Sequence, residues 1–209
     1  MLEFVLATHN KNKVRELESL LRETLGDRVD FSVKTAESVG ITDEIEENGS
    51  TFEENARIKA RALASERYIS VADDSGLSVD ALGGAPGVYS ARYSGKGDAE
   101  NNRKLLRELS DRHGGERRAR FVTAVCCILP SGEELMLRGE CEGLILESPR
   151  GEGGFGYDPL FLYEPAGKSF AEMSGAEKNA VSHRGRAMRA LAERLADIYL
   201  RGETDGNRK

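Results

Sequence analysis

The N-terminal stretch of residues 1–25 constrains the fold most, because it reads as a strand, a short polar loop and a helix. Residues 2–8, LEFVLAT, are apolar except for Glu3 and predict a buried strand. The polar segment HNKNK follows, and from Val14 to Leu25 the apolar residues then recur at helical spacing. Such an opening unit is typical of an α/β protein.

The segments that follow continue this alternation of helix and strand. In TFEE, Thr51 is a predicted N-cap and Glu54 its capping-box partner, so residues 51–66 predict a second helix. YISVA, residues 68–72, predicts a short buried strand that ends at the acid pair Asp73-Asp74. Further predictions are a helix over 99–112, an antiparallel pair or meander over 118–130 and 134–147, and a last helix capped by Ser182.

Two glycine-rich segments, residues 83–98 and 151–161, predict long loops of functional importance. The second contains GEGGFG, which matches the dinucleotide-binding pattern, but that pattern requires a helix directly after the glycines. Here YDP follows, and Pro159 disfavours a helical residue before it. AGKS at 166–169 resembles the end of a P-loop, yet Leu162 stands where the first glycine belongs. A phosphate group would therefore have to bind to a different kind of loop.

Composition restricts the classes of partner. A net charge of −6 disfavours a non-specific grip on nucleic acid, and the longest apolar runs fall well below the roughly 20 residues of a membrane span. The N-terminal segment has no basic region or cleavage site, so no signal peptide is expected. Cys126, Cys127 and Cys141 are expected to be buried, reduced thiols, which suit a cytoplasmic protein. The three histidines are too scattered for a metal cage.

Two polar clusters have the chemistry of a phosphate and metal site. Backbone N–H groups near Thr8 and Asn10, together with Lys13, suit a phosphate, although ordinary N-capping explains them equally. The second cluster is acidic and suits Mg²⁺, with capping of the following turn as the alternative. Because successive strand residues face opposite sides, one acid of the pair should face the site while the other braces it or reaches a lysine. The acidic residues are Glu46, Glu47, Glu54, Asp73 and Asp74.

Two further clusters suit a planar heterocycle. In GGFGYDP, Phe155 and Tyr157 offer flat faces and Asp158 an acceptor, although packing of both rings in the core is an equal alternative. In EKNAVSHRGRA, His183 and Arg184 fall in the first turn of the last helix. Cations there oppose the helix dipole, so an anion, a carbonyl-rich ligand or a nearby carboxylate should compensate them.

With these clusters in order, the chain resembles the Ham1/RdgB family of inosine triphosphate pyrophosphatases over nearly its whole length. The resemblance is carried by THNKNKVRELESLL, GSTFEENARIKA, VADDSGLSVDALGGAPGVYSARYSG, GGFGYDPLF and EKNAVSHRGRA. It implies an α/β fold with a mixed, curved central sheet, flanking helices and two lobes around a substrate cleft. It also implies a homodimer. Because the sequence shows no internal repeat and no linker, one such domain is expected over residues 1–201, followed by a flexible tail over 202–209.

The resemblance assigns roles to particular residues. Asp74 would be general base and metal ligand, Glu47 the second metal ligand, with neighbouring Glu46 leaving the register open, and Lys13 a catalytic cation. His9 stands where the family has glycine. The substrate contacts would be Thr8, His9, Asn10, Lys11, Asn12, Lys13, Ser75, Phe155, Gly156, Tyr157, Asp158, Lys178, His183 and Arg184.

The expected activity is hydrolysis of ITP, dITP, XTP or dXTP to a monophosphate and pyrophosphate, with Mg²⁺ as cofactor and Mn²⁺ as a substitute. This would cleanse the cytoplasmic nucleotide pool. Two alternatives stay open: a Maf-like pyrophosphatase acting on modified pyrimidines, dTTP or UTP, and a nucleotide sensor without catalysis. Neither nucleic acid nor a membrane is an expected partner.

Overall fold

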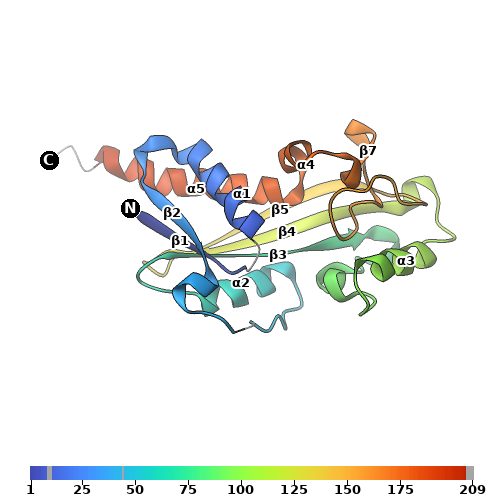
Figure 1. Ribbon diagram of the computed structural model, residues 1–209, viewed down its shortest axis with the longest axis horizontal. Coiled ribbons are helices and arrows are strands. Elements are labelled where there is room, and N and C mark those ends of the chain that lie inside the picture. Colours follow the sequence, from blue (N-terminus) through green and yellow to red (C-terminus); the bar gives the residue numbers. More distant parts are fainter. Residues whose placement is uncertain (9–10, 44, 206–209) are drawn as a thin grey trace. The chain divides into compact units, whose positions relative to one another are not determined.

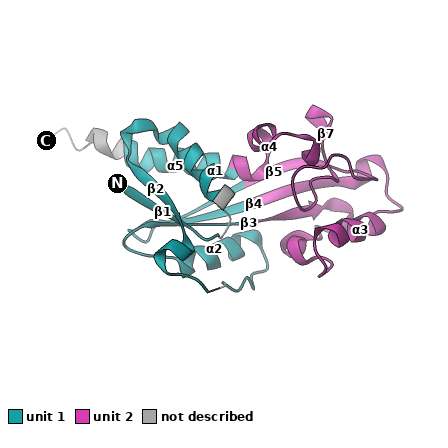
Figure 2. Cartoon of the chain, viewed as in Figure 1, with its two compact units in different colours: residues 1–74, 124–138, 187–209 teal, residues 75–123, 139–186 magenta. Residues whose placement is uncertain are grey.

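A computed structural model describes residues 1–8, 11–43 and 45–205, without the side chains of residues 11, 12, 16 and 201–205. Its seven-stranded sheet, with strand order β2-β1-β3-β4-β5-β6-β7 and flanking helices, confirms the predicted mixed α/β class. The chain forms two compact units, which Figure 2 colours separately. The first unit comprises residues 1–74, 124–138 and 187–209, and the second comprises residues 75–123 and 139–186.

The helices and strands are labelled in Figure 1. The strands are β1 (Leu2–Leu6), β2 (Phe31–Thr35), β3 (Ile69–Val79), β4 (Arg118–Ile128), β5 (Glu134–Ile145), β6 (Phe161–Tyr163) and β7 (Lys168–Ser169). The α-helices are α1 (Lys11–Leu25), α2 (Phe52–Ala62), α3 (Asp98–Glu108), α4 (Gly175–Val181) and α5 (His183–Asp205). The boundaries between the units fall within β3, β4, β5 and α5.

The first unit has a parallel sheet core around β1, which pairs with β2 on one side and with β3 on the other. Helices α1 and α5 cover one face of these strands and α2 lies on the opposite face (Figure 1). Phe4 and Leu6 pack into the core cluster that contains apolar residues of α1 and α5, whereas Val5 packs against Leu63 at the end of α2. Burial on both faces explains why β1 is almost continuously apolar.

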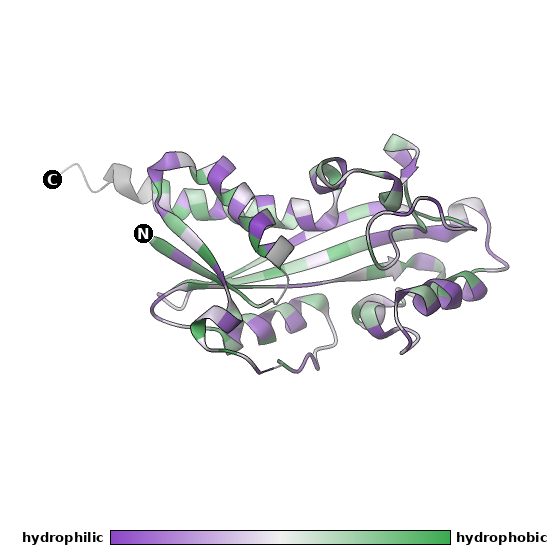
Figure 3. Ribbon diagram, in the orientation of Figure 1, coloured by the Kyte–Doolittle hydropathy of each residue, from purple (hydrophilic) through white to green (hydrophobic). Residues whose placement is uncertain are grey.

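The second unit has its own core around the aromatic residues Phe121, Phe161 and Phe170. Leu105 and Leu109, from α3 and its C-cap, belong to this core as well. The remainder of α3 is mostly hydrophilic in Figure 3, as expected for a helix with one buried side. Strands β4 and β5 are neighbours joined by a short turn, so they are antiparallel as predicted.

Several elements differ in extent from the prediction, among them α2 and α3, which end at Ala62 and Glu108, before the predicted ends at 66 and 112. Strand β3 does not end at the acid pair but continues through it to Val79, because Leu77 and Val79 bury further apolar surface in the second unit. Helix α4 was not predicted; Lys178 lies within it, upstream of Ser182 as expected. Helix α5 continues to Asp205 and so includes part of the predicted tail, while residues 206–209 lie outside the described residues.

The helices of the described chain were also searched for membrane spans. None of them combines the length and the apolar character that crossing a bilayer requires. The three cysteines are free and buried. The burial of the three thiols agrees with the sequence-based expectation.

Candidate active site

The acid pair that interrupts β3 sends its two side chains to different partners in the first unit. Asp73 is only 4% exposed, and its Oδ2 accepts a hydrogen bond from Lys13 Nζ at 2.9 Å. Asp74 Oδ2 accepts from Asn55 Nδ2 at 3.0 Å. This division follows the alternation of side chains along a strand. As expected, one acid of the pair holds a lysine; that lysine is one of the predicted phosphate-binding residues.

The ammonium group of Lys59 brings two distant carboxylates together. Its Nζ lies 3.0 Å from Glu47 Oε1 and 3.7 Å from Asp74 Oδ1. Glu46, the alternative ligand left open by the sequence, is exposed and has no such contact with Lys59 among the described contacts. Glu47 and Asp74 therefore reach the same position in space, and a positive charge stabilises both of them there.

Asn55 ties the loop that carries Glu47 to the strand that carries Asp74. Its side chain is fully buried; Nδ2 donates to Asp74, and Oδ1 accepts from the backbone N–H of Gly49 at 2.8 Å. A Cβ at Gly49 would lie 2.7 Å from Asn55 Oδ1, so only glycine fits this close approach. Both polar ends of the buried amide are thus satisfied.

The sequence analysis missed Asn55 and Lys59 as functional residues. They lie four residues apart in α2, and this spacing places them on the same face of the helix. Both occur in ENARIKA, within a segment that carries the family resemblance, but periodicity alone does not separate them from ordinary polar helix residues.

The start of α2 is fixed by a capping arrangement that differs in part from the prediction. Thr51 Oγ1 accepts from the Glu54 N–H at 3.1 Å, as predicted for an N-cap. The Glu54 carboxylate, however, binds the N–H and hydroxyl of Ser50, each at 2.7 Å, rather than closing the box on Thr51. These hydrogen bonds lower the pKa of Glu54. Glu54 therefore braces the loop and is not a free metal ligand.

Glu47 and Asp74 could offer a divalent cation two carboxylate ligands. Within the described residues no group of three or more His, Cys, Asp or Glu side chains could hold a metal. Mg²⁺, however, commonly uses only one or two carboxylates and completes its shell with water and substrate phosphate. The position that Lys59 Nζ occupies between Glu47 and Asp74 shows that both carboxylates can face one cation.

The structure describes only part of the predicted phosphate-binding loop. Thr8 follows β1 and its N–H donates to the carbonyl of Leu6 at 2.8 Å. His9 and Asn10 lie outside the described residues, as do the side chains of Lys11 and Asn12. Among His9, Lys11 and Lys13, the basic residues predicted to bind phosphate here, the structure therefore describes the side chain of Lys13 only.

In the second unit, the glycine-rich loop is organised around Asp158. This carboxylate is 2% exposed, and its Oδ2 accepts from the Phe155 N–H at 2.9 Å and from Lys178 Nζ at 2.5 Å. A Cβ at Gly154 would lie 2.2 Å from that oxygen, so the loop needs glycine there. Asp158 thus holds the loop and Lys178 in place.

The two aromatic residues of this loop have different environments. Phe155 is 76% exposed, and Lys178 Nζ lies 4.6 Å from the centroid of its ring. Tyr157 is instead packed in the core, where its hydroxyl donates to the Ser90 carbonyl at 2.9 Å and burial raises its pKa. Core packing, one of the two interpretations offered above, therefore describes Tyr157, and only Phe155 presents an accessible ring.

The remaining predicted residues of the second unit lie near the start of α5 and on β3. Ser182 Oγ accepts from the Gly185 N–H at 3.1 Å, which is the predicted N-cap. The imidazole of His183 stacks on Phe121 with a centroid distance of 4.7 Å and an interplanar angle of 12°. Arg184 follows it in the first turn. Ser75 shares a 2.8 Å hydrogen bond with Thr123.

Comparison with known proteins finds similarity over nearly the whole chain. The sequence profile of the Ham1 family matches residues 4–194. The dITP/XTP pyrophosphatase of Bacillus cereus is 47% identical over 205 residues, covering 96% of this chain and 98% of the relative. That of Clostridium perfringens is 42% identical over 207 residues, covering 95% and 99%.

Several solved structures are similar over most of the chain. A HAM1 protein from Coxiella burnetii has a TM-score of 0.85 and 40% identity, covering 94% of this chain and 100% of that one. The nucleoside-triphosphatase and dITP/XTP pyrophosphatase of Mycobacterium abscessus has a TM-score of 0.75 and 41% identity, covering 91% and 98%.

Proposed function

The chain belongs to the Ham1 family, and we propose that it hydrolyses non-canonical purine nucleoside triphosphates, namely ITP, dITP, XTP and dXTP, to a monophosphate and pyrophosphate. The observation that carries this proposal is the convergence of Glu47 and Asp74 on the ammonium of Lys59. The activity named for the relatives at 47% and 42% identity supports the substrate class.

The first unit supplies the groups that phosphoryl chemistry needs. Asp74 orients a water molecule and accepts its proton as the water attacks the α-phosphorus, and the pyrophosphate leaves. Lys13, held by Asp73, and Lys59 stabilise the negative charge that grows on this leaving group. No covalent nucleophile is required.

Glu47 and Asp74 are the residues that would hold Mg²⁺, or Mn²⁺ in its place. When bound, the ion supplies positive charge against the phosphate oxygens. Lys59 then stays within reach of the same phosphates, because its aliphatic chain allows the ammonium to move away from the carboxylates.

The second unit supplies the groups that suit a purine base. Phe155 offers an exposed ring for stacking, and Lys178, His183 and Arg184 are hydrogen-bond donors. Hypoxanthine and xanthine carry an acceptor oxygen at position 6, where adenine carries an amino donor. Donors that face this position would be left unpaired with ATP, and leaving buried donors unpaired strongly disfavours binding.

Product analysis tests this function. The purified protein should release pyrophosphate from ITP and XTP in the presence of Mg²⁺, with little single phosphate and much slower turnover of ATP. Preference for dTTP or UTP would favour a Maf-like specificity. Binding of ITP without any product would indicate a nucleotide sensor.

The cellular setting is part of the same proposal. Free, buried cysteines suit the cytoplasm, where removal of damaged purine nucleotides would protect the precursor pool. The homodimer implied by the resemblance stays a prediction, and light scattering of the purified protein measures its mass directly.

A further inference from the structure

The loop that carries Phe155 depends on contacts from elsewhere for its conformation. Gly154 and Gly156, on either side of Phe155, both have positive φ angles, of 76° and 60°. The segment belongs to no helix or strand, so no regular hydrogen-bond ladder holds it. A glycine-flanked segment of this kind has high conformational entropy unless other groups restrain it.

Two side chains of α3 bind both polar groups of Gly156. Asp98 Oδ2 accepts from the Gly156 N–H at 2.8 Å, and Asn102 Nδ2 donates to the Gly156 carbonyl at 3.0 Å. The two residues lie four positions apart, so they project from the same face of the helix. One carboxylate and one amide therefore clamp the backbone directly after Phe155.

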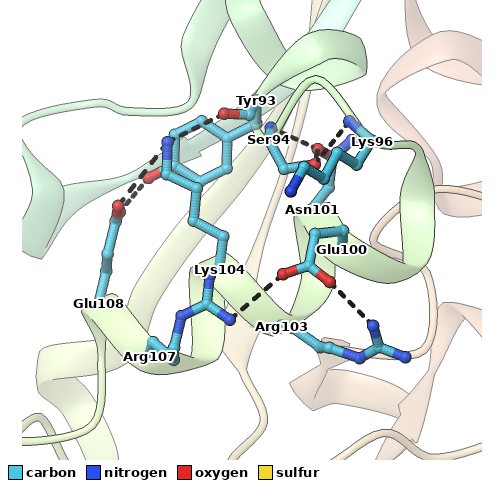
Figure 4. A network of polar contacts seen from close by, with 9 residues as sticks. All are labelled: Tyr93, Ser94, Lys96, Glu100, Asn101, Arg103, Lys104, Arg107 and Glu108. Carbon is cyan, nitrogen blue, oxygen red and sulfur yellow. Dashed lines mark hydrogen bonds and ion pairs between the residues drawn. The ribbon is translucent and has the colours of Figure 1, made fainter.

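The helix that carries this clamp is itself firmly anchored. Leu105 is fully buried, and Asn101 Oδ1 accepts from the N–H and the hydroxyl of Ser94, both at 2.7 Å. Figure 4 shows this network, and it shows Glu100 pointing away to Arg103 and Arg107. Asp98 and Asn102 thus hold the loop in a fixed position against α3.

We propose that Asp98 and Asn102 are positioning residues that hold Phe155 ready to receive the base and so set the affinity for the nucleoside part of the substrate. This inference rests on the proposed function. A ring that is ordered before binding loses less entropy when a base stacks on it. The clamp acts on the backbone of Gly156, so it should affect binding of the nucleoside and leave the chemical step unchanged.

The test compares Asp98→Ala, Asn102→Ala and the double variant with wild type. Each single variant should raise KM for ITP and the inhibition constant of IMP about tenfold. This is roughly the change in affinity expected when one hydrogen bond that orders the loop is lost. The value of kcat should change less than about twofold, and inhibition by inorganic tripolyphosphate should be unchanged. Asp98→Asn, which keeps an acceptor oxygen, should recover much of the loss.

Glu100→Ala is the matched control, because Glu100 is an acid of the same helix that pairs with arginines and does not contact the loop. It should leave all constants unchanged. Hydrogen exchange of the peptide containing Gly156 gives an independent readout, and it should become faster in the two clamp variants but not in Glu100→Ala.

Several outcomes would overturn the inference: unaltered exchange in the double variant, an unaltered IMP constant despite faster exchange, or equal losses for IMP and tripolyphosphate. If the double variant does not fold, the single variants and Asp98→Asn decide. Failure of wild type to release pyrophosphate from ITP would instead reject the proposed function, while exchange and IMP binding would still decide the clamp.

Discussion

At the scale of single residues, Asp74 is the side chain on which the proposed chemistry depends most. It contacts Asn55 and Lys59 and lies in a strand whose backbone is fixed by its neighbours. Asp74→Asn should lower kcat by at least about 100-fold, because the amide cannot accept a proton, with little change in KM. Steady-state kinetics with ITP measures both constants.

Asp80→Asn is the control for that substitution, since Asp80 pairs with Arg120 at the surface. It should retain wild-type kinetics. Turnover by Asp74→Asn within a few-fold of wild type would show that Asp74 is not the base.

The contacts of Asn55 lead to a separate prediction about the affinity for a metal ion. Because it links Asp74 to the loop of Glu47, Asn55→Ala should weaken Mn²⁺ binding about tenfold, the lower range for residues that support metal ligands. The free Mn²⁺ signal in electron paramagnetic resonance measures this without turnover. Asn48→Ala, at an exposed position of the same loop, is the control. Equal Mn²⁺ affinity in both variants would contradict the assigned role of Asn55.

The divergence of Asp73 and Asp74 could be expected from sequence, because alternation along a strand is a local property. The partners of Asp74 could not. Asn55 and Lys59 come from α2, and only the folded chain brings this helix beside β3. The burial of Tyr157 was likewise undecided, since an aromatic residue suits a core and a binding site equally well.

At the scale of elements, α4 depends on its cap. Ser174 Oγ accepts from the Glu177 N–H, and the Glu177 carboxylate accepts from the Ser174 N–H. This hydrogen bond, together with one from Lys168, lowers the pKa of Glu177 to about 2. A helix this short has little stability of its own. Ser174→Ala should therefore lower the free energy of unfolding by about 1 kcal/mol in urea titrations.

Ser110→Ala, at an exposed position, should change the same free energy by less than about 0.5 kcal/mol. If both variants were equally stable, the cap of α4 would not contribute to folding. Sequence reading missed this helix because its apolar pattern is too short to show helical periodicity.

The buried thiols of β4 and β5 predict how the protein responds to alkaline pH. Burial raises the pKa of Cys126 to about 12 and that of Cys141 to about 11, from an ordinary value of 9.0. The unfolded chain releases these protons at lower pH than the folded chain, so stability should fall as pH rises above about 9.

Urea titrations between pH 8 and 10 measure this loss, and Cys126→Ala and Cys141→Ala should each reduce the slope. A thiol reagent at pH 8 should label the native protein slowly and the unfolded protein rapidly. Fast labelling of the native state would contradict the burial of these side chains.

At the scale of the whole molecule, fold class was predictable because long apolar segments with clear periodicity define β1, α1, β4, β5 and α5. The short strands β2, β6 and β7 were not predicted. In β2 only Phe31 is buried, and β6 and β7 span few residues, so none of the three strands shows a recognisable alternation of apolar and polar residues. The continuation of β3 beyond its acids depends on a second core, which local sequence does not reveal.

The most direct test of the account is to follow the solvent oxygen during hydrolysis of ITP in water enriched in ¹⁸O, with Mg²⁺ present. Attack at the α-phosphorus, with Asp74 accepting the proton, places one ¹⁸O in IMP and leaves pyrophosphate unlabelled. Label found in pyrophosphate, release of single phosphate, or full activity in the presence of excess chelator would contradict the proposed chemistry.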